Sequence, residues 1–195
     1  MATIHSVAVY CASSSQMKQA YFDEAYRLGR LLATHSMEVV YGDGGIGLMG
    51  ALADGVLSAG GTITGVIPQF MVDEGWNNPR STRTHVVGSM HERKALIERL
   101  SDAMVALPGG IGTYEELLEC LTWKQLGLHT KPVVILNQEG YYDALLSAID
   151  HMVAERFLHP DYKRLFIAVS TADEVLPALL QTNPWTIRTR KDAAF

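Results

Sequence analysis

The sequence predicts a single α/β domain of the Rossmann-like type, with a doubly wound, mostly parallel sheet and helices on both faces. Two observations lead to this prediction. Short β-branched or apolar runs recur along the 195 residues, and longer stretches with helical periodicity separate most of these runs. Strands and helices that alternate in this way imply right-handed crossovers between parallel strands.

Seven apolar runs are expected to form buried strands, because each is short and carries almost no charge. In chain order they are residues 7–10, 39–41, 62–67, 84–87, 103–107, 133–136 and 166–169. The stretches between them place apolar side chains three and four residues apart, which is the period of a helix packed on a sheet. Two such sets are Phe22, Ala25, Leu28 and Leu32, and Tyr142, Leu145, Leu146 and Ile149.

Two segments depart from this alternation. Residues 68–82 are rich in proline, glycine and asparagine, which favours a long loop and a candidate lid. Residues 183–195 carry three basic side chains without an apolar period, so a solvated C-terminal tail is expected there. The predicted domain therefore covers residues 1–182.

Composition restricts the partners. The chain is 48% hydrophobic and has a net charge of -5, so no general positive field exists to attract nucleic acid or an anionic membrane. No apolar run approaches membrane-spanning length, and the first residues do not resemble a secretory signal. Cys11 and Cys120 lie far apart in a thiol-poor chain, which favours a reducing, cytoplasmic compartment.

Two glycine-rich turns follow predicted strands, at residues 42–50 and 108–113. Ligands of open parallel sheets bind at this edge, where loops lead into the N-termini of helices. Glycine lets backbone N–H groups approach an anion, and the helix dipole adds attraction, so the pair of turns predicts a phosphate site. Either turn could instead be only a tight turn, Thr113 could be only a cap, and the serines at 13–15 are more typical of caps than of ligands.

Other phosphate and cofactor motifs are absent. No G-K-S or G-K-T follows a glycine turn, and the turn after the first strand lacks G-x-G-x-x-G, which argues against a P-loop triphosphatase and against NAD or FAD. The seven histidines are scattered, so we expect no metal and no cofactor. Cys120 falls in the middle of a helix and is expected to be a buried structural thiol.

Two charged residues fall on helix faces that should point inward. Arg93 shares a stripe with Met90 and Ile97, and Glu116 precedes Cys120 at helical spacing, whereas Glu115 aligns with polar neighbours. Burying a charge without a partner costs several kcal/mol, so both should be paired or functional. A plain buried salt bridge remains the structural alternative, but a position beside the phosphate site favours catalysis.

These motifs closely resemble those of the LOG family, the cytokinin-activating phosphoribohydrolases often described as lysine decarboxylase-like. The signature P-G-G-x-G-T-x-x-E matches residues 108–116, the companion glycine motif resembles residues 41–50, and M-x-x-R-K matches residues 90–94. With Cys11 to Ser14 and residues 123–132, the resemblance covers most of the chain.

The resemblance implies a Rossmann-like homodimer that hydrolyses the N-glycosidic bond of N6-modified adenosine 5′-monophosphates, often of AMP as well. It implies Arg93 and Glu116 as the catalytic pair, and a nucleoside monophosphate as the small-molecule partner. The candidate substrate-binding residues are Ser14, Gly44, Gly45, Met90, Lys94, Gly109, Gly110, Gly112 and Thr113.

One position departs from the family pattern. Many relatives carry three successive glycines where this chain has Gly42-Asp43-Gly44. A carboxylate there could repel a phosphate, so the side chain of Asp43 is expected to turn away from the anion or to be neutralised by a nearby base.

Two other functions stay open at this point. The chain could be a nucleotide sensor or carrier without turnover, although the complete pair of Arg93 and Glu116 argues against it, or a nucleosidase for other purine monophosphates. A decarboxylase would need pyridoxal phosphate on a lysine. Only Lys94 has a comparable setting, and it is better interpreted as a phosphate contact.

Overall fold

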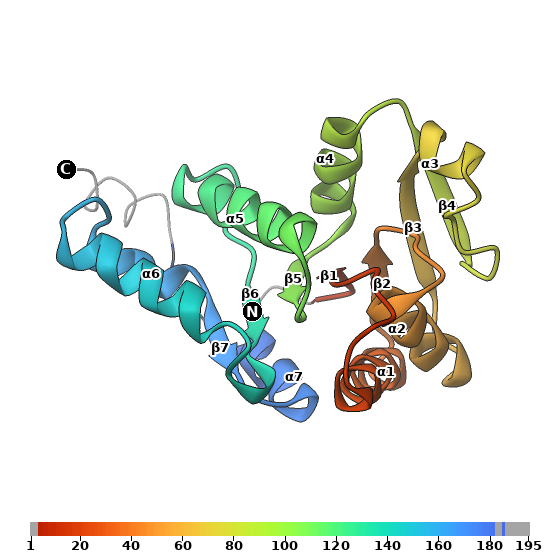
Figure 1. Cartoon of the computed structure of the whole chain (residues 1–195), viewed down its shortest axis with the longest axis horizontal. Helices are drawn as coiled ribbons and strands as arrows, with labels where there is room; N and C mark the ends of the chain where they lie inside the picture. The colour runs from red at the N-terminus through yellow and green to blue at the C-terminus, as the bar shows by residue number, and fades with distance from the viewer. Residues whose placement is uncertain (1–3, 182–184, 186–195) are drawn as a thin grey trace.

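A computed structural model describes residues 4–181 and 185 (Figure 1). It contains one seven-stranded sheet in the order β4-β3-β2-β1-β5-β6-β7, and every neighbouring pair is parallel. The strands are β1 (Ser6–Tyr10), β2 (Glu38–Tyr41), β3 (Ile63–Pro68), β4 (Arg83–Val87), β5 (Ala103–Ala106), β6 (Val133–Leu136) and β7 (Ile167–Val169). The predicted fold class is confirmed.

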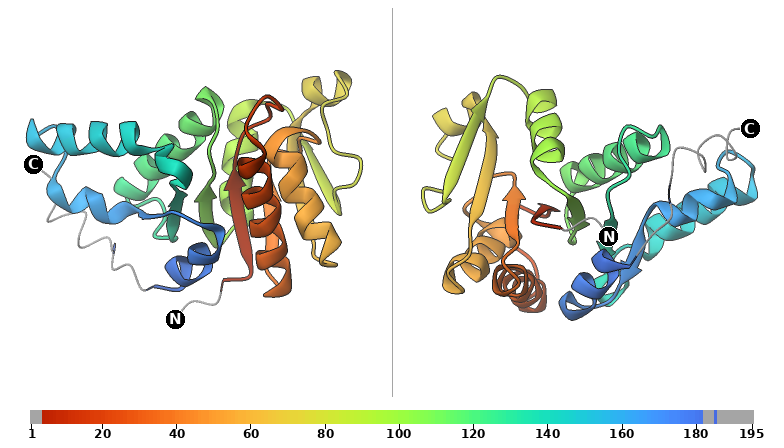
Figure 2. Two further views of the ribbon diagram at one scale, coloured as in Figure 1. Left: turned by 60° about the horizontal axis from the view of Figure 1, so that its bottom comes forward. Right: turned by 180° about the vertical axis from the view of Figure 1, so that it is seen from behind.

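Helices cover both faces of the sheet, as the two further views show (Figure 2). Helices α1, α2 and α7 pack on one face, and α4, α5 and α6 pack on the other. The α-helices are α1 (Gln19–Thr34), α2 (Gly47–Ser58), α3 (Gln69–Asp73), α4 (Met90–Leu100), α5 (Ile111–Gln125), α6 (Asp143–Ala154) and α7 (Ala172–Leu180). Two 3₁₀ turns, η1 (Gln138–Gly140) and η2 (Pro160–Leu165), complete the described elements.

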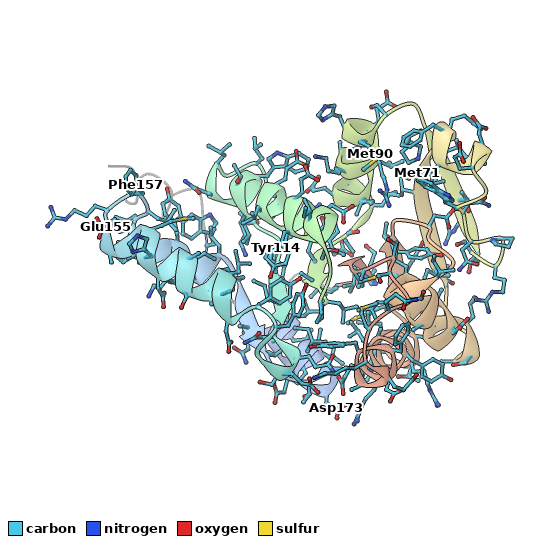
Figure 3. All side chains as sticks on the ribbon, in the orientation of Figure 1. Met71, Met90, Tyr114, Glu155, Phe157 and Asp173 are labelled. Carbon is cyan, nitrogen blue, oxygen red and sulfur yellow. The ribbon has the colours of Figure 1, made fainter. Side chains whose placement is uncertain are left out.

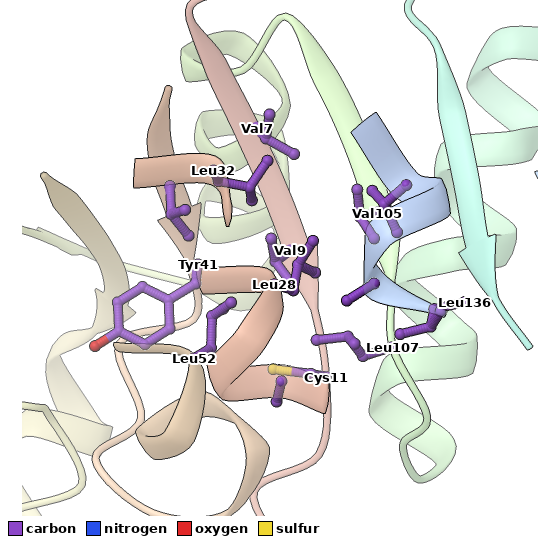
Figure 4. Close-up of a cluster of buried hydrophobic side chains, with 14 of the residues drawn as sticks. Val7, Val9, Cys11, Leu28, Leu32, Tyr41, Leu52, Val105, Leu107 and Leu136 are labelled. Atoms are coloured by element: carbon purple, nitrogen blue, oxygen red, sulfur yellow. The ribbon is translucent and has the colours of Figure 1, made fainter. Parts of the chain in front are cut away.

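The central strand β1 shows how the core is divided. Its side chains alternate between the faces, so Val7 and Val9 join the cluster that contains Leu28 of α1 and Leu52 of α2 (Figure 4). Ala8 and Tyr10 join the cluster on the opposite face. Each fully buried leucine contributes about 1.5–3 kcal/mol, so the apolar stripes of the helices fix them to the sheet.

The order of the strands reverses between β1 and β5. The chain adds β2, β3 and β4 outward on one side of β1 and then returns to place β5 on its other side. The loops that leave β1 and β5 therefore diverge to opposite faces of the sheet, which opens a crevice at their carboxyl ends. The predicted glycine turns follow β2 and β5 at this same edge.

Three expectations need correction. The run at 84–87 forms β4 but not a buried strand, because β4 lies at the edge of the sheet and most of its residues are exposed. Residues 68–82 are not entirely a loop, because the five-residue helix α3 begins directly after β3. The expected solvated tail is wrong at Trp185, whose buried indole N–H donates to the Lys124 carbonyl at 2.8 Å and whose ring packs on Tyr162. A single apolar residue has no period, so the sequence carried no signal for it. The other residues of that segment, 183, 184 and 186–195, lie outside the described part.

The described helices were also compared with the dimensions of a bilayer. None of those within residues 4–181 combines the length and the apolar composition that a membrane crossing requires.

Candidate active site

A cavity of about 330 Å³ opens at the switch point between β1 and β5. Its wall is built from the loops after β1, β2 and β5 and from the first turns of α4 and α5. The lining residues are Val9, Cys11, Ala12, Ser13, Gly42, Met49, Met90, Arg93, Gly110, Ile111, Gly112, Thr113, Glu115 and Glu116. Both predicted catalytic residues are among them, and the size is in the range of small-molecule sites.

The N-terminus of α5 points its backbone donors at this cavity. Gly110 is the N-cap residue, and its carbonyl accepts the first helical bond from the N–H of Tyr114 at 3.1 Å. Within the described residues, no group accepts a hydrogen bond from the N–H groups of Gly110, Ile111, Gly112 or Thr113. Free amides and the positive end of the helix dipole make this turn a site for an anion.

The N-terminus of α2 is different, although a similar glycine-rich turn precedes it. The carbonyl of Ala12 accepts hydrogen bonds from the N–H groups of Leu48 at 2.9 Å and Met49 at 3.3 Å. Gly47 has a positive φ of 64°, and a Cβ there would lie 2.4 Å from the carbonyl oxygen of Ser14. The loop after β1 thus crosses this helix end and occupies two of its amides, which leaves fewer donors for an anion here than at α5.

Five predicted substrate-binding residues do not line the first cavity: Ser14, Gly44, Gly45, Lys94 and Gly109. Ser14 is exposed, and its hydroxyl accepts from the N–H of Gln16 at 3.2 Å, so the neighbouring Ser13 lines the cavity instead. Gly44 and Gly45 line a second, adjacent cavity. From sequence, the three successive serines could not be distinguished.

Asp43 turns into the protein. Its side chain is fully buried beside Gly65 of β3 and accepts hydrogen bonds from the hydroxyls of Ser81 at 2.5 Å and Thr84 at 3.2 Å. Burial raises the pKa of this carboxyl above its usual value, although the two hydroxyls oppose the shift. Asp43 lines neither cavity, which agrees with the expectation that its side chain turns away from an anion.

Arg93 is buried in the wall between the two cavities. Its Nε donates to the Val66 carbonyl at 3.1 Å, and its Nη2 donates to the Gly42 carbonyl at 2.9 Å. These bonds fix the guanidinium between β3 and the first glycine turn. The suggestion that Arg93 pairs directly with Glu116 is wrong, because no ion pair within 4.0 Å joins these two described residues. The guanidinium donates instead to the backbone carbonyls of Val66 and Gly42.

Glu116 is partly buried, and its carboxyl makes no hydrogen bond or ion pair within the described residues. Burial raises its pKa to about 7, and the positive charge of Arg93 only partly opposes this shift. A carboxyl with that pKa can accept or donate a proton at neutral pH. The inward direction predicted for Glu116 is confirmed.

Lys94 is buried, but it does not line the cavity. Its ammonium group pairs with Glu115 and, at 3.0 Å, with Glu119. Glu115 is half-exposed and reaches the rim of the cavity with part of its surface. The interpretation of Lys94 as a phosphate contact therefore conflicts with this geometry. The helical alignment of Glu115 with Glu119 was the sequence signal for a shared cation.

The second cavity, of about 380 Å³, shares Ser13, Gly42, Met49 and Arg93 with the first. Its wall is mostly apolar because α3 and the turn after it contribute Met71 and Trp76. Figure 3 shows Met71 on α3 and Met90, which lines the first cavity, at the beginning of α4. The sequence predicted a loop here but identified neither Met71 nor Trp76, since apolar residues in a turn-rich segment have no periodicity.

Acidic, histidine and cysteine side chains were considered as metal ligands. Among residues 4–181 and Trp185, no three of them gather in a way that could hold an ion.

Comparison with known proteins places this geometry in a family. A family model described as "Possible lysine decarboxylase" matches residues 49–179. The probable cytokinin riboside 5′-monophosphate phosphoribohydrolase LOGL9 of Oryza sativa subsp. japonica is 44% identical over 91% of this chain and 78% of its own. The cytokinin riboside 5′-monophosphate phosphoribohydrolase LOG5 of Arabidopsis thaliana is 43% identical over the same shares.

Among solved structures, the molybdenum cofactor carrier protein of Chlamydomonas reinhardtii superposes with a TM-score of 0.68. The match covers 89% of this chain and 94% of that one at 22% identity, which establishes a common fold and nothing more. The matches in sequence extend over both glycine turns and over α4 and α5. The chain therefore belongs to the LOG family, the phosphoribohydrolase family whose model carries the description of a possible lysine decarboxylase.

Proposed function

We propose that this protein hydrolyses the N-glycosidic bond of adenosine 5′-monophosphates, with or without an N6 substituent, to give the free base and ribose 5-phosphate. One observation supports this most. Helix α5 presents free backbone amides at its first turn and the carboxyl of Glu116 one turn later, and both open into the same cavity. The relatives named as cytokinin riboside 5′-monophosphate phosphoribohydrolases support the same activity.

In the proposed complex, the phosphate binds the N–H groups of Gly110, Gly112 and Thr113. The ribose then lies along the helix beside Glu116. As the C1′–N9 bond breaks, positive charge develops on the sugar, and the carboxylate of Glu116 stabilises it or takes a proton from the attacking water. Water adds to C1′, and the departing purine gains a proton. Arg93, fixed by two carbonyls, supplies positive charge in the wall next to the substrate.

The base is proposed to extend toward the second cavity. An apolar wall that includes Met71 and Trp76 suits a purine ring and a hydrophobic N6 substituent. Because the two cavities share Arg93 and Met49, one ligand can reach both. This arrangement supports the acceptance of AMP together with N6-modified substrates.

We also propose a homodimer. Ile111, Leu118 and Leu128, on α5 and the turn after it, are large apolar side chains that stay exposed in the single chain. Light scattering of the purified protein should give twice the mass of the chain. A cytoplasmic location stays a prediction from the sequence, to be tested by imaging the tagged protein.

The description as a lysine decarboxylase raises the question of pyridoxal phosphate. That cofactor would need a lysine at the site to form a Schiff base. Neither cavity is lined by a lysine. Lys94 is engaged by two carboxylates, and Lys124 is buried where it donates to the Leu165 carbonyl at 2.7 Å. The residues present do not fit pyridoxal phosphate.

The proposal is tested by incubating the purified protein with AMP, N6-isopentenyladenosine monophosphate, GMP and CMP and measuring released base by chromatography. We expect adenine-type base from the first two nucleotides and little from CMP. Adenosine should be a much poorer substrate than AMP, because it lacks the phosphate that positions the ribose. Tight binding of AMP without release of base would instead favour a carrier or sensor.

A further inference from the structure

Two adjacent tyrosines hold the loop that leads from β5 into α5. The hydroxyl of Tyr141 donates to the carbonyl of Gly109 at 2.5 Å, and the hydroxyl of Tyr142 donates to the carbonyl of Leu107 at 2.7 Å. Both tyrosines follow η1, after the carboxyl end of the neighbouring strand β6. Neither belongs to the motifs that identified the site, and neither lines the cavity.

The hydrogen bond to the Gly109 carbonyl also sets the orientation of the N–H of Gly110. A trans peptide is planar, and its C=O and N–H point in opposite directions. Drawing the Gly109 oxygen toward Tyr141 therefore turns the N–H of Gly110 the other way. Gly110 has no side chain of its own to restrict this peptide, and a Cβ at Gly110 would meet no atom within 4 Å. The tyrosine hydroxyl supplies the restriction that the glycine loop lacks.

The tyrosine ring is itself held in place. The ring of Tyr141 packs edge-on against Tyr142, with centroids 5.2 Å apart, and against Tyr21 of α1, with centroids 6.2 Å apart. Tyr114, labelled on α5 in Figure 3, contacts both Tyr141 and Tyr142. Tyr142 is fully buried, and burial raises the pKa of its hydroxyl, which therefore stays protonated as a donor. A packed aromatic cluster thus places both hydroxyls on the loop.

We propose that Tyr141 is a positioning residue for the phosphate subsite. Its hydroxyl holds the Gly109–Gly110 peptide so that the amide at the mouth of α5 faces the anion before the ligand arrives, while Tyr142 secures the loop where it leaves β5. Such preorganisation increases affinity because the loop loses less freedom on binding. The inference rests on the proposed binding of a phosphate at α5, but it does not require that the bound nucleotide is hydrolysed.

The test compares Tyr141→Phe with wild type by calorimetry, using inorganic phosphate, ribose 5-phosphate, AMP and adenosine as probes. The variant removes one hydroxyl and keeps the ring. We expect the Kd of every phosphate-bearing probe to rise by about three- to tenfold, the usual effect of one hydrogen bond, and the Kd of adenosine to stay the same. In turnover, the KM for AMP should rise by a similar factor, while kcat changes less than twofold.

Tyr21→Phe is the matched control, because this ring belongs to the same cluster and its hydroxyl makes no hydrogen bond to the described residues. It should bind all four probes like wild type. Unchanged phosphate affinity in Tyr141→Phe, or an equal loss for adenosine, would overturn the proposal. If wild type binds phosphate but releases no base, the proposed hydrolysis is wrong. The positioning role of Tyr141 is then still decided by the calorimetry, because it depends only on phosphate binding.

Discussion

The two glycine-rich turns look alike in sequence and behave differently in the structure. At the start of α2, the Ala12 carbonyl accepts from the amides of Leu48 and Met49, and Gly47 is needed because another backbone segment lies against it. At the start of α5, the corresponding amides have no partner in the described chain, and Cβ atoms at Gly110 and Gly112 would meet only open space. Glycine allows close backbone packing in the first turn, whereas in the second it leaves the backbone amides uncovered.

This difference explains why a glycine motif alone is weak evidence for a phosphate site. Whether the amides are available depends on which carbonyl crosses the helix end, and that carbonyl can come from a distant segment. Here it comes from the loop after β1. The contrast between the turns can be tested by changing one residue at a time.

The largest effect is expected at Glu116, which lies one turn into the helix with the free amides. Glu116→Gln keeps the shape of the side chain and removes its charge, so kcat for AMP should fall at least about a hundredfold, roughly 2.7 kcal/mol of barrier, with little change in nucleotide affinity. Glu115→Gln should keep most of the activity. If Glu116→Gln stays active while Glu115→Gln is inactive, Glu115 and not Glu116 carries the catalytic carboxyl.

Alanine substitutions separate the roles of the two turns directly. Gly112→Ala adds a methyl group where the phosphate should bind, so the KM for AMP should rise more than about tenfold while the melting temperature is kept or increased, since alanine favours a helix. Gly47→Ala forces a side chain into a positive φ and against the Ser14 carbonyl, and should cost about 2–3 kcal/mol of stability. Urea denaturation and steady-state kinetics on both variants measure the contrast. A destabilised Gly112→Ala with normal KM would refute it.

The carboxyl of Glu116 on α5 should also make the free energy of unfolding depend on pH. The pKa of Glu116 is about 7 in the folded protein and near 4.5 when unfolded, so the folded state holds this proton more tightly. The free energy of unfolding should therefore decrease as pH rises from about 4.5 to about 7, by about 2 kcal/mol after allowance for partial exposure. Glu116→Gln should lack this loss and be more stable than wild type at pH 8. An equal stability difference at pH 5 and pH 8 would contradict the shifted pKa.

The smallest effect is expected in the first turn, at Asp43. Its carboxyl faces β3 and two hydroxyls, so Asp43→Gly should change the KM for AMP by less than about tenfold, or 1.4 kcal/mol. The loss of the bonds to Ser81 and Thr84 should instead lower the melting temperature. A large gain in affinity for AMP would mean that the carboxylate repels the phosphate after all.

The sequence predicted what depends on local periodicity. Seven short apolar runs became the seven strands, and the helical faces that placed Arg93 and Glu116 inward proved correct. Contacts between distant segments were not predictable in this way. The carbonyls of Val66 and Gly42 that hold Arg93, and the burial of Trp185 against Lys124, depend on how the completed sheet brings the loops together. The pairing of Lys94 with two carboxylates on α5 likewise depends on how α4 and α5 pack together, so its role at a phosphate stays a prediction from the sequence.

The division of the site between α5 and α3 has an evolutionary consequence. The groups proposed for chemistry and for phosphate binding lie at the beginnings of α4 and α5, whereas Met71 and Trp76 belong to a short helix and the turn after it. If the base binds as proposed, we expect mutations in α3 to alter which base is accepted without disturbing the bond-breaking step. Such a fold can diversify its substrates gradually, because new specificity need not pass through an inactive intermediate.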